Sequence, residues 1–181
     1  MFERQDLKIY NKGFGGNRIC DMYSRWIEDT LNIEFDVLSI LFGINDVGFG
    51  LRLNMGADCE KFQFVYDRML YEVKQKKPDA KIILMEPFLL KTDYCHPEFG
   101  NDIFKDWEIW NEEIKKRGSI VKELSEKYNA IFVPLHDEFQ KLSEKFGPEH
   151  FSHDCVHPTP AGHEFIARKW LECCSEIISD L

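Results

Sequence analysis

The sequence of 181 residues lacks any long hydrophobic run. A helix that crosses a bilayer needs about 20 consecutive apolar residues, and no segment approaches that length. The first ten residues, MFERQDLKIY, also lack the apolar centre of a secretory signal. We therefore expect a cytoplasmic chain that neither crosses nor binds a membrane.

An excess of positive charge is lacking as well. The 23 lysines and arginines are outnumbered by 32 aspartates and glutamates, which gives a net charge of -9. Proteins that bind nucleic acid present a basic stripe to the phosphates. The two basic clusters here, at residues 74–77 and 115–117, lie beside acidic residues on predicted helix surfaces. The composition therefore argues against a nucleic-acid partner.

Paired cysteine motifs are also absent. The six cysteines are scattered and form no CxxC, so we expect free thiols rather than disulfides. Residues 150–163 hold four histidines and Cys155, and zinc accepts such ligands. Their spacing fits no closed pattern of four ligands. We expect no metal and no cofactor, with zinc binding by this segment as the alternative.

The sequence does contain a regular alternation of strand-like and helical segments. Nearly continuous apolar runs at residues 35–42, 80–86 and 130–134 are typical of strands buried in a parallel sheet, and a shorter β-like run lies at residues 7–11. Apolar residues at helical spacing follow these runs. We therefore predict a single domain over residues 1–181, with an α/β fold in which a parallel sheet forms the middle of a three-layer α/β/α sandwich.

The segments between these elements are predicted as follows. Asn17 caps a helix whose inward residues are Ile19, Tyr23, Trp26 and Ile27. Residues 43–58 and 88–104 form loops. The second loop carries four aromatic residues, which either stack on a sugar ring or anchor a lid: Phe88, Tyr94, Phe99 and Phe104.

Three short motifs lie at the ends of predicted strands or in the last loop, where α/β proteins bind ligands. They are NKGFGGN at residues 11–17, GIND at residues 43–46 and DCVH at residues 154–157. In the last motif, Asp154 can bind one ring nitrogen of His157 and leave the other nitrogen to act as a base. Each motif also has a simple structural explanation: a glycine turn, an Asx turn or a surface pair.

Taken together and in this order, the three motifs resemble those of the SGNH (GDSL-type) ester hydrolases over essentially the whole chain. The surrounding segments are similar to the carbohydrate-acetylesterase subgroup. The resemblance implies that His157 is the general base and that Asp154 orients it. It further implies that the Gly16 N–H and the Asn45 amide bind the oxyanion. The implied reaction is the hydrolysis of short acyl or acetyl esters of a carbohydrate or small alcohol, without a cofactor.

The same resemblance implies a nucleophilic serine in a Gly-Asp-Ser turn after a first strand, and no Gly-Asp-Ser occurs in this sequence. We expect none of the eight serines to be the nucleophile. We also expect the first strand of the fold to be missing from between the strands at residues 7–11 and 35–42. That gap would expose a sheet edge through which the chain self-associates.

Three explanations for the missing block remain open. The chain is a fragment of an active esterase, an inactive relative, or a chain whose gap is filled by another chain. We predict little or no esterase activity for the chain by itself. The alternative function is a non-catalytic module that binds carbohydrates or esters.

Overall fold

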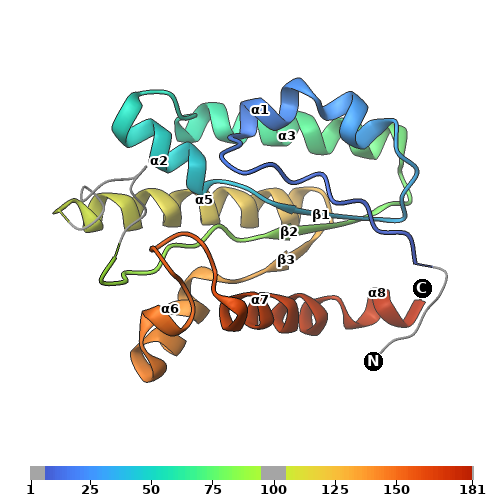
Figure 1. The fold of residues 1–181 in the computed structure, drawn as a ribbon. Helices are drawn as coiled ribbons and strands as arrows, with labels where there is room; N and C mark the ends of the chain where they lie inside the picture. The colour runs from blue at the N-terminus through green and yellow to red at the C-terminus, as the bar shows by residue number, and fades with distance from the viewer. Residues whose placement is uncertain (1–6, 95–104, 181) are drawn as a thin grey trace.

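The computed structural model describes residues 7–94 and 105–180, and it has an α/β fold in which helices cover both faces of a parallel sheet (Figure 1). The three strands are β1 (Val37–Leu41), β2 (Lys81–Met85) and β3 (Ile131–Val133). They follow the order β1-β2-β3 in the sheet, and both pairs are parallel. The predicted fold class is therefore confirmed.

The helices lie in two layers on either side of the sheet (Figure 1). The first layer contains α1 (Ile19–Ser24), the π-helical turn η1 (Ile27–Leu31), α3 (Cys59–Lys76) and α5 (Trp107–Lys127). In the second layer are α6 (His136–Phe146), the 3-10 turn η2 (Pro148–His150), α7 (Pro160–Cys173) and α8 (Ser175–Asp180). Helix α2 (Ile44–Leu53) follows β1 directly and contacts α5.

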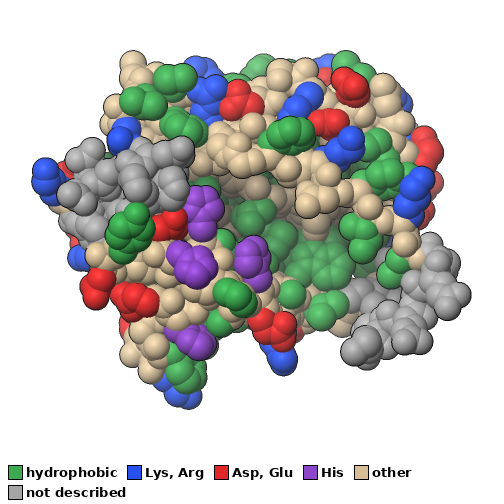
Figure 2. Space-filling model, in the orientation of Figure 1, with side chains coloured by type: hydrophobic (Ala, Val, Ile, Leu, Met, Phe, Trp, Pro, Cys, Tyr) green, Lys and Arg blue, Asp and Glu red, His purple; other side chains and the backbone are tan. Residues whose placement is uncertain are grey.

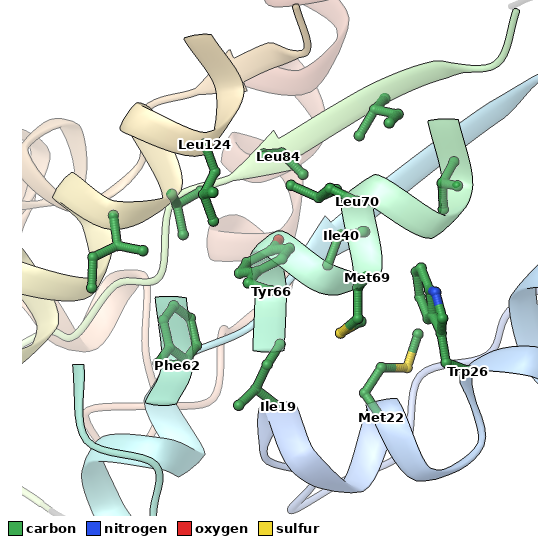
Figure 3. Packing of buried hydrophobic residues seen from close by; sticks show 14 of the residues in the cluster. Ile19, Met22, Trp26, Ile40, Phe62, Tyr66, Met69, Leu70, Leu84 and Leu124 are labelled. Atoms are coloured by element: carbon green, nitrogen blue, oxygen red, sulfur yellow. The ribbon is translucent and has the colours of Figure 1, made fainter. Parts of the chain in front are cut away.

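Successive residues of β2 point to opposite layers, as the pleat of a strand requires. Ile82 and Leu84 pack with the first layer, and Ile83 and Met85 pack with the second. Figure 3 shows the core of the first layer, in which side chains of the α1 region meet those of α3 on one face of the sheet. Its labelled members are Ile19, Met22, Trp26, Ile40, Phe62, Tyr66, Met69, Leu70, Leu84 and Leu124.

The strand predicted at residues 7–11 is not present. This segment is irregular and exposed, with Leu7 at 56% and Ile9 at 87% of full exposure. Within the described residues, β1 is consequently the outer strand of the sheet and pairs on one side alone. Ser39 and Leu41 of β1 are exposed, although the run at residues 35–42 is apolar enough for a strand covered on both sides.

The prediction of a loop at residues 43–58 is wrong over most of that range, because α2 occupies residues 44–53. Glycine and asparagine lower the helix propensity of this segment, and tertiary packing overrides that preference. Gly43 begins the segment with a φ of +132°, and a Cβ at this position would lie 3.1 Å from Pro87. This position therefore requires glycine.

The inward face predicted for the first helix is partly wrong. Ile19 and Trp26 are buried as expected, but Tyr23 and Ile27 are exposed and Met22 is buried in their place. The α-helix ends at Ser24 and a π-helical turn follows, so the helical spacing of the sequence does not continue through the segment.

The aromatic loop predicted at residues 88–104 is described only as far as residue 94. Phe88 is buried, and its ring centroid lies 4.5 Å from that of Phe139, so it belongs to the core and cannot stack on a sugar. Tyr94 is 58% exposed, whereas Phe99 and Phe104 lie outside the described residues. Among the described helices, none combines the length and apolarity that a membrane span needs.

Candidate active site

The loop between η2 and α7 places a carboxylate against a histidine ring. Asp154 Oδ2 lies 2.9 Å from Nδ1 of His157, and Asp154 Oδ1 lies 3.1 Å from it. Asp154 Oδ1 also accepts the backbone N–H groups of His157 at 2.8 Å and of Val156 at 3.3 Å. When Nδ1–H donates to the carboxylate, the neutral ring carries its lone pair on Nε2. This is the arrangement of a general base and its orienting carboxylate.

Asp154 remains ionised although its side chain is only 8% exposed. Burial by itself raises the pKa of Asp154, but the backbone and ring N–H groups of His157 outweigh burial and hold the pKa below its ordinary range. The ionised carboxylate therefore accepts from the ring and holds His157 in one orientation.

The turn before α1 contains Gly16 in a conformation that glycine adopts readily. Its φ is +77°, and the Asn17 N–H closes the turn by donating to Phe14 O at 3.3 Å. A positive φ at the third residue is characteristic of a type II turn. A Cβ at Gly16 would meet no atom within 4 Å. Glycine is therefore required by the backbone conformation, and the space beside it is open.

Asn45, in the first turn of α2, is hydrogen-bonded to the same turn. Its Nδ2 donates to Asn17 O at 3.0 Å. Because an amide group carries two N–H bonds, this contact orients the side chain and engages one of them.

Asn17 does not cap α1 as predicted. Its Oδ1 instead accepts the Arg25 guanidinium at 2.8 and 3.2 Å, and Arg25 also lies over the Phe14 ring.

Asp46 has a central place in this region that the sequence analysis missed. Its side chain is fully buried, and it accepts the backbone N–H groups of Ile19 at 3.0 Å and Ala57 at 3.2 Å. Burial raises the pKa of Asp46 to about 6, against the lowering effect of these N–H groups and of nearby arginines. The sequence gives little signal for this role, since an Asn-Asp pair suits an ordinary Asx turn equally well.

Helix α2 connects the glycine turn with the histidine loop. Asn45 is bonded to the turn that contains Gly16, while Val47 lies in one buried cluster with Cys155 and Val156. Figure 2 shows histidine side chains gathered at one end of a hollow that contains hydrophobic side chains, between the N-terminal segment and α7. The folded chain therefore brings elements of all three sequence motifs to one region at the carboxyl end of the sheet.

Contacts from other segments fix the conformation of the histidine loop. Cys155 has a φ of +72°, which is uncommon for a residue with a side chain. Its carbonyl accepts the Leu90 N–H at 2.9 Å, and its sulfur lies 3.3 Å from Thr92 Oγ1. The Ser152 hydroxyl donates to the His157 carbonyl at 3.1 Å. Tertiary contacts thus hold a loop that local preferences would not select.

The histidines of residues 150–163 do not gather into a metal centre. Throughout residues 7–94 and 105–180, no three histidine, cysteine or acidic side chains lie close enough together to hold an ion. The zinc alternative therefore has no support in this part of the chain.

His136 is the first residue of α6, where burial lowers its pKa to about 4 and its Nε2 lies 3.0 Å from Asn111 Oδ1.

Comparison with known proteins shows which family the chain is similar to. A profile of the GDSL-like lipase/acylhydrolase family matches residues 3–165. An acetylxylan esterase from Geobacillus stearothermophilus is 30% identical over 173 residues, which cover 94% of this chain and 74% of that enzyme. A crystal structure assigned as a GDSL-like lipase from Parabacteroides merdae has a TM-score of 0.81 at 30% identity, covering 93% of this chain and 73% of the other.

A solved variant of the Geobacillus acetylxylan esterase has a TM-score of 0.77 at 28% identity, covering 91% of this chain and 71% of that one. Three further structures of that esterase are described as catalytic mutants, with alanine in place of a serine, an aspartate and a histidine. Its aspartate and histidine are three positions apart, as are Asp154 and His157. The present chain belongs to the GDSL-like lipase/acylhydrolase family.

Proposed function

We propose that this chain carries the general base and the oxyanion site of a serine-type hydrolase that cleaves short acyl esters. In this proposal the Nε2 of His157 accepts the proton of the attacking hydroxyl and returns it to the leaving alcohol, while Asp154 orients the ring. The observation that carries the proposal is the contact of Asp154 with Nδ1 of His157 at 2.9 Å, in a loop packed against the helix that bears Asn45.

In the same mechanism, Gly16 and Asn45 stabilise the oxyanion. The tetrahedral intermediate places negative charge on the former carbonyl oxygen, and donors that already point at that position need no reorganisation. The Gly16 N–H and the second N–H of the Asn45 amide are the proposed donors. One such donor contributes about 3 to 4 kcal/mol of transition-state stabilisation in known enzymes.

For the substrate, we propose an acetyl ester of a carbohydrate. The support is the similarity to an acetylxylan esterase, together with a site that is open at Gly16 and has an exposed His157 ring at 59% side-chain exposure. The proposed chemistry requires no metal or organic cofactor, because the base and the oxyanion donors all come from the protein.

We further propose that the chain by itself hydrolyses esters slowly, since its sequence contains no Gly-Asp-Ser. In serine proteases that lack a triad member, the oxyanion site and substrate binding still give a rate about 10³ to 10⁴ times that in water. We therefore expect slow hydrolysis of p-nitrophenyl acetate that falls in Asn45→Ala and changes little in His157→Ala. A Ser119→Ala variant, altered on the exposed surface of α5, serves as the control.

Two results would revise this proposal in different ways. Fast turnover that His157→Ala abolishes would show that the chain supplies its own nucleophile, and the proposed low activity would then be wrong. A rate equal to that of buffer alone, unaffected by Asn45→Ala, would contradict the hydrolase proposal itself.

The second candidate function is binding of acetylated carbohydrate without turnover. The observation in its favour is that the Asp154–His157 pair and the Asn45 contact are retained in a sequence without Gly-Asp-Ser. Calorimetric titration with an acetylated and a deacetylated xylooligosaccharide tests it. Binding of the acetylated form alone, with no acetate released, would favour the binding module.

We also propose that the chain self-associates through the edge of β1 that pairs with no strand among residues 7–94 and 105–180. The Lys81 N–H donates to Asp36 O, so the alternating backbone groups of Val37, Ser39 and Leu41 point to the other side. The strand has no charged residue or proline, the usual protection of an edge. Sedimentation velocity should show a concentration-dependent dimer that Leu41→Lys removes and Leu53→Lys, on α2, does not. A monomer at every concentration would contradict the proposal.

A further inference from the structure

A buried carboxylate links the oxyanion turn to the rest of the site. Asp46 has no exposed surface, whereas its neighbour Asn45 is half-buried. Each of its oxygens has a separate partner: Oδ2 accepts from the Ile19 N–H, and Oδ1 accepts from the Ala57 N–H. Ile19 lies three residues after Gly16, at the point where the turn becomes α1. Asp46 therefore connects the start of α1 to the first turn of α2.

The Ala57 side of this link is anchored to the body of the protein. The Arg117 guanidinium of α5 donates to Ala57 O at 2.6 Å. The adjoining backbone lies directly on α2, because a Cβ at Gly56 would be 1.9 Å from Asp46 O. Helix α2, residues 56–57 and α5 thus form a packed base, to which the oxyanion turn is attached through Asp46 and Asn45.

A carboxylate is an unfavourable choice for stability at this position. Burial opposes ionisation of Asp46, and packed apolar residues often stabilise a protein at least as well as buried charges do. What a carboxylate supplies is two acceptors in fixed directions for two N–H donors, with hydrogen bonds strengthened by its charge. An asparagine of the same shape has one acceptor oxygen, and its amide group would face the other N–H.

We propose that Asp46 is a positioning residue for the oxyanion site, which fixes the Gly16 N–H relative to the Asn45 amide by holding the Ile19 N–H. This inference rests on the proposed role of Gly16 and Asn45 as oxyanion donors. Asp46 itself is buried behind the turn and does not contact the substrate.

The proposal predicts a specific defect in Asp46→Asn. Loss of one acceptor lets the turn shift against α2, and a displacement of about 1 Å at a catalytic group can lower a rate by about 10²-fold. We expect the part of the ester hydrolysis rate that depends on Asn45 to fall by about 10- to 100-fold, with the loss in kcat rather than in KM.

The experiment compares Asp46→Asn with the matched variant Asp58→Asn. Asp58 caps α3 through the Lys61 N–H at 2.7 Å, close to the same loop but without a hydrogen bond to the oxyanion turn. The rates of both variants on p-nitrophenyl acetate are measured with and without Asn45→Ala. Asp46→Asn should lower the rate by a larger factor when Asn45 is present than when it is alanine, and Asp58→Asn should leave the rate unchanged. Equal fractional losses with and without Asn45 would overturn the proposal.

Amide hydrogen exchange separates failure of this inference from failure of the proposed function. Asp46→Asn should accelerate exchange at Ile19 or Ala57 and change the Gly16 amide signal, and Asp58→Asn should not. A wild-type rate that does not depend on Asn45 would refute the proposed function and, with it, the catalytic meaning of Asp46. Unchanged exchange at both amides would refute the link itself, whatever the activity.

Discussion

The raised pKa of Asp46 also predicts how the unfolding free energy of the protein changes with pH. Its pKa is raised by burial from 3.8 in an unfolded chain to about 6 in the fold. A raised carboxyl pKa means that the folded state binds a proton more tightly than the unfolded state. The contribution of protonation to stability is therefore complete below the unfolded pKa and is lost as the pH rises through 6.

The size of the effect follows from the two pKa values. Between pH 7.5 and pH 5, Asp46 should make the wild-type protein more stable by about 1.4 kcal/mol relative to a residue that does not titrate. The full effect, reached below the unfolded pKa, is about 3 kcal/mol. Asn at this position cannot titrate, so the free energy of unfolding of wild type minus that of Asp46→Asn should increase as the pH falls.

The assay is urea unfolding of both proteins at several pH values, followed by tryptophan fluorescence from the buried Trp26 and Trp110. The substitution also removes a hydrogen-bond acceptor, which adds a difference in unfolding free energy that does not vary with pH. The test therefore uses only the change of that difference with pH. A difference in unfolding free energy that stays constant between pH 7.5 and pH 5 would refute the argument. A general effect of acid on the fold cancels in this difference because both proteins experience it.

Three further predictions concern the motif residues. Asp154 has a lowered pKa, so its stabilising contribution is present above the unfolded pKa and is lost as the pH falls through the folded pKa. The unfolding free energy of wild type minus that of Asp154→Asn should therefore decrease as the pH falls, whereas the same difference for Asp46→Asn should increase. Asp154→Asn should also weaken the preference for the Nδ1–H tautomer of His157, which ¹⁵N NMR of the ring measures directly; an unchanged spectrum would contradict the assigned pair. Gly16→Ala should cost about 1 to 2 kcal/mol through its φ of +77° alone, while Gly15→Ala, with open space and no positive φ, should be nearly neutral in thermal unfolding.

Much of the fold could be predicted from the order of apolar runs. The strands at residues 80–86 and 130–134 agree with β2 and β3 because a continuous apolar run is what burial between two helical layers requires. The same reasoning failed at residues 7–11 and 43–58. At residues 7–11 the predicted strand lacks, among the described residues, a neighbouring strand with which to pair. At residues 43–58 the glycine-rich segment becomes helical because its side chains are buried by other parts of the fold. Neither condition can be recognised from the local sequence.

The candidate site divides in the same way. From the sequence alone one can identify the residue types of the site: a histidine three positions after an aspartate, an asparagine after a predicted strand, and glycines before a predicted helix. The tertiary structure shows that α2 contacts both the Gly16 turn, through Asn45, and the buried cluster of the His157 loop, through Val47, and that the buried carboxylate of Asp46 accepts the Ile19 N–H after the turn. These contacts join residues that are far apart along the chain, so their formation depends on packing and burial rather than on the preferences of neighbouring residues.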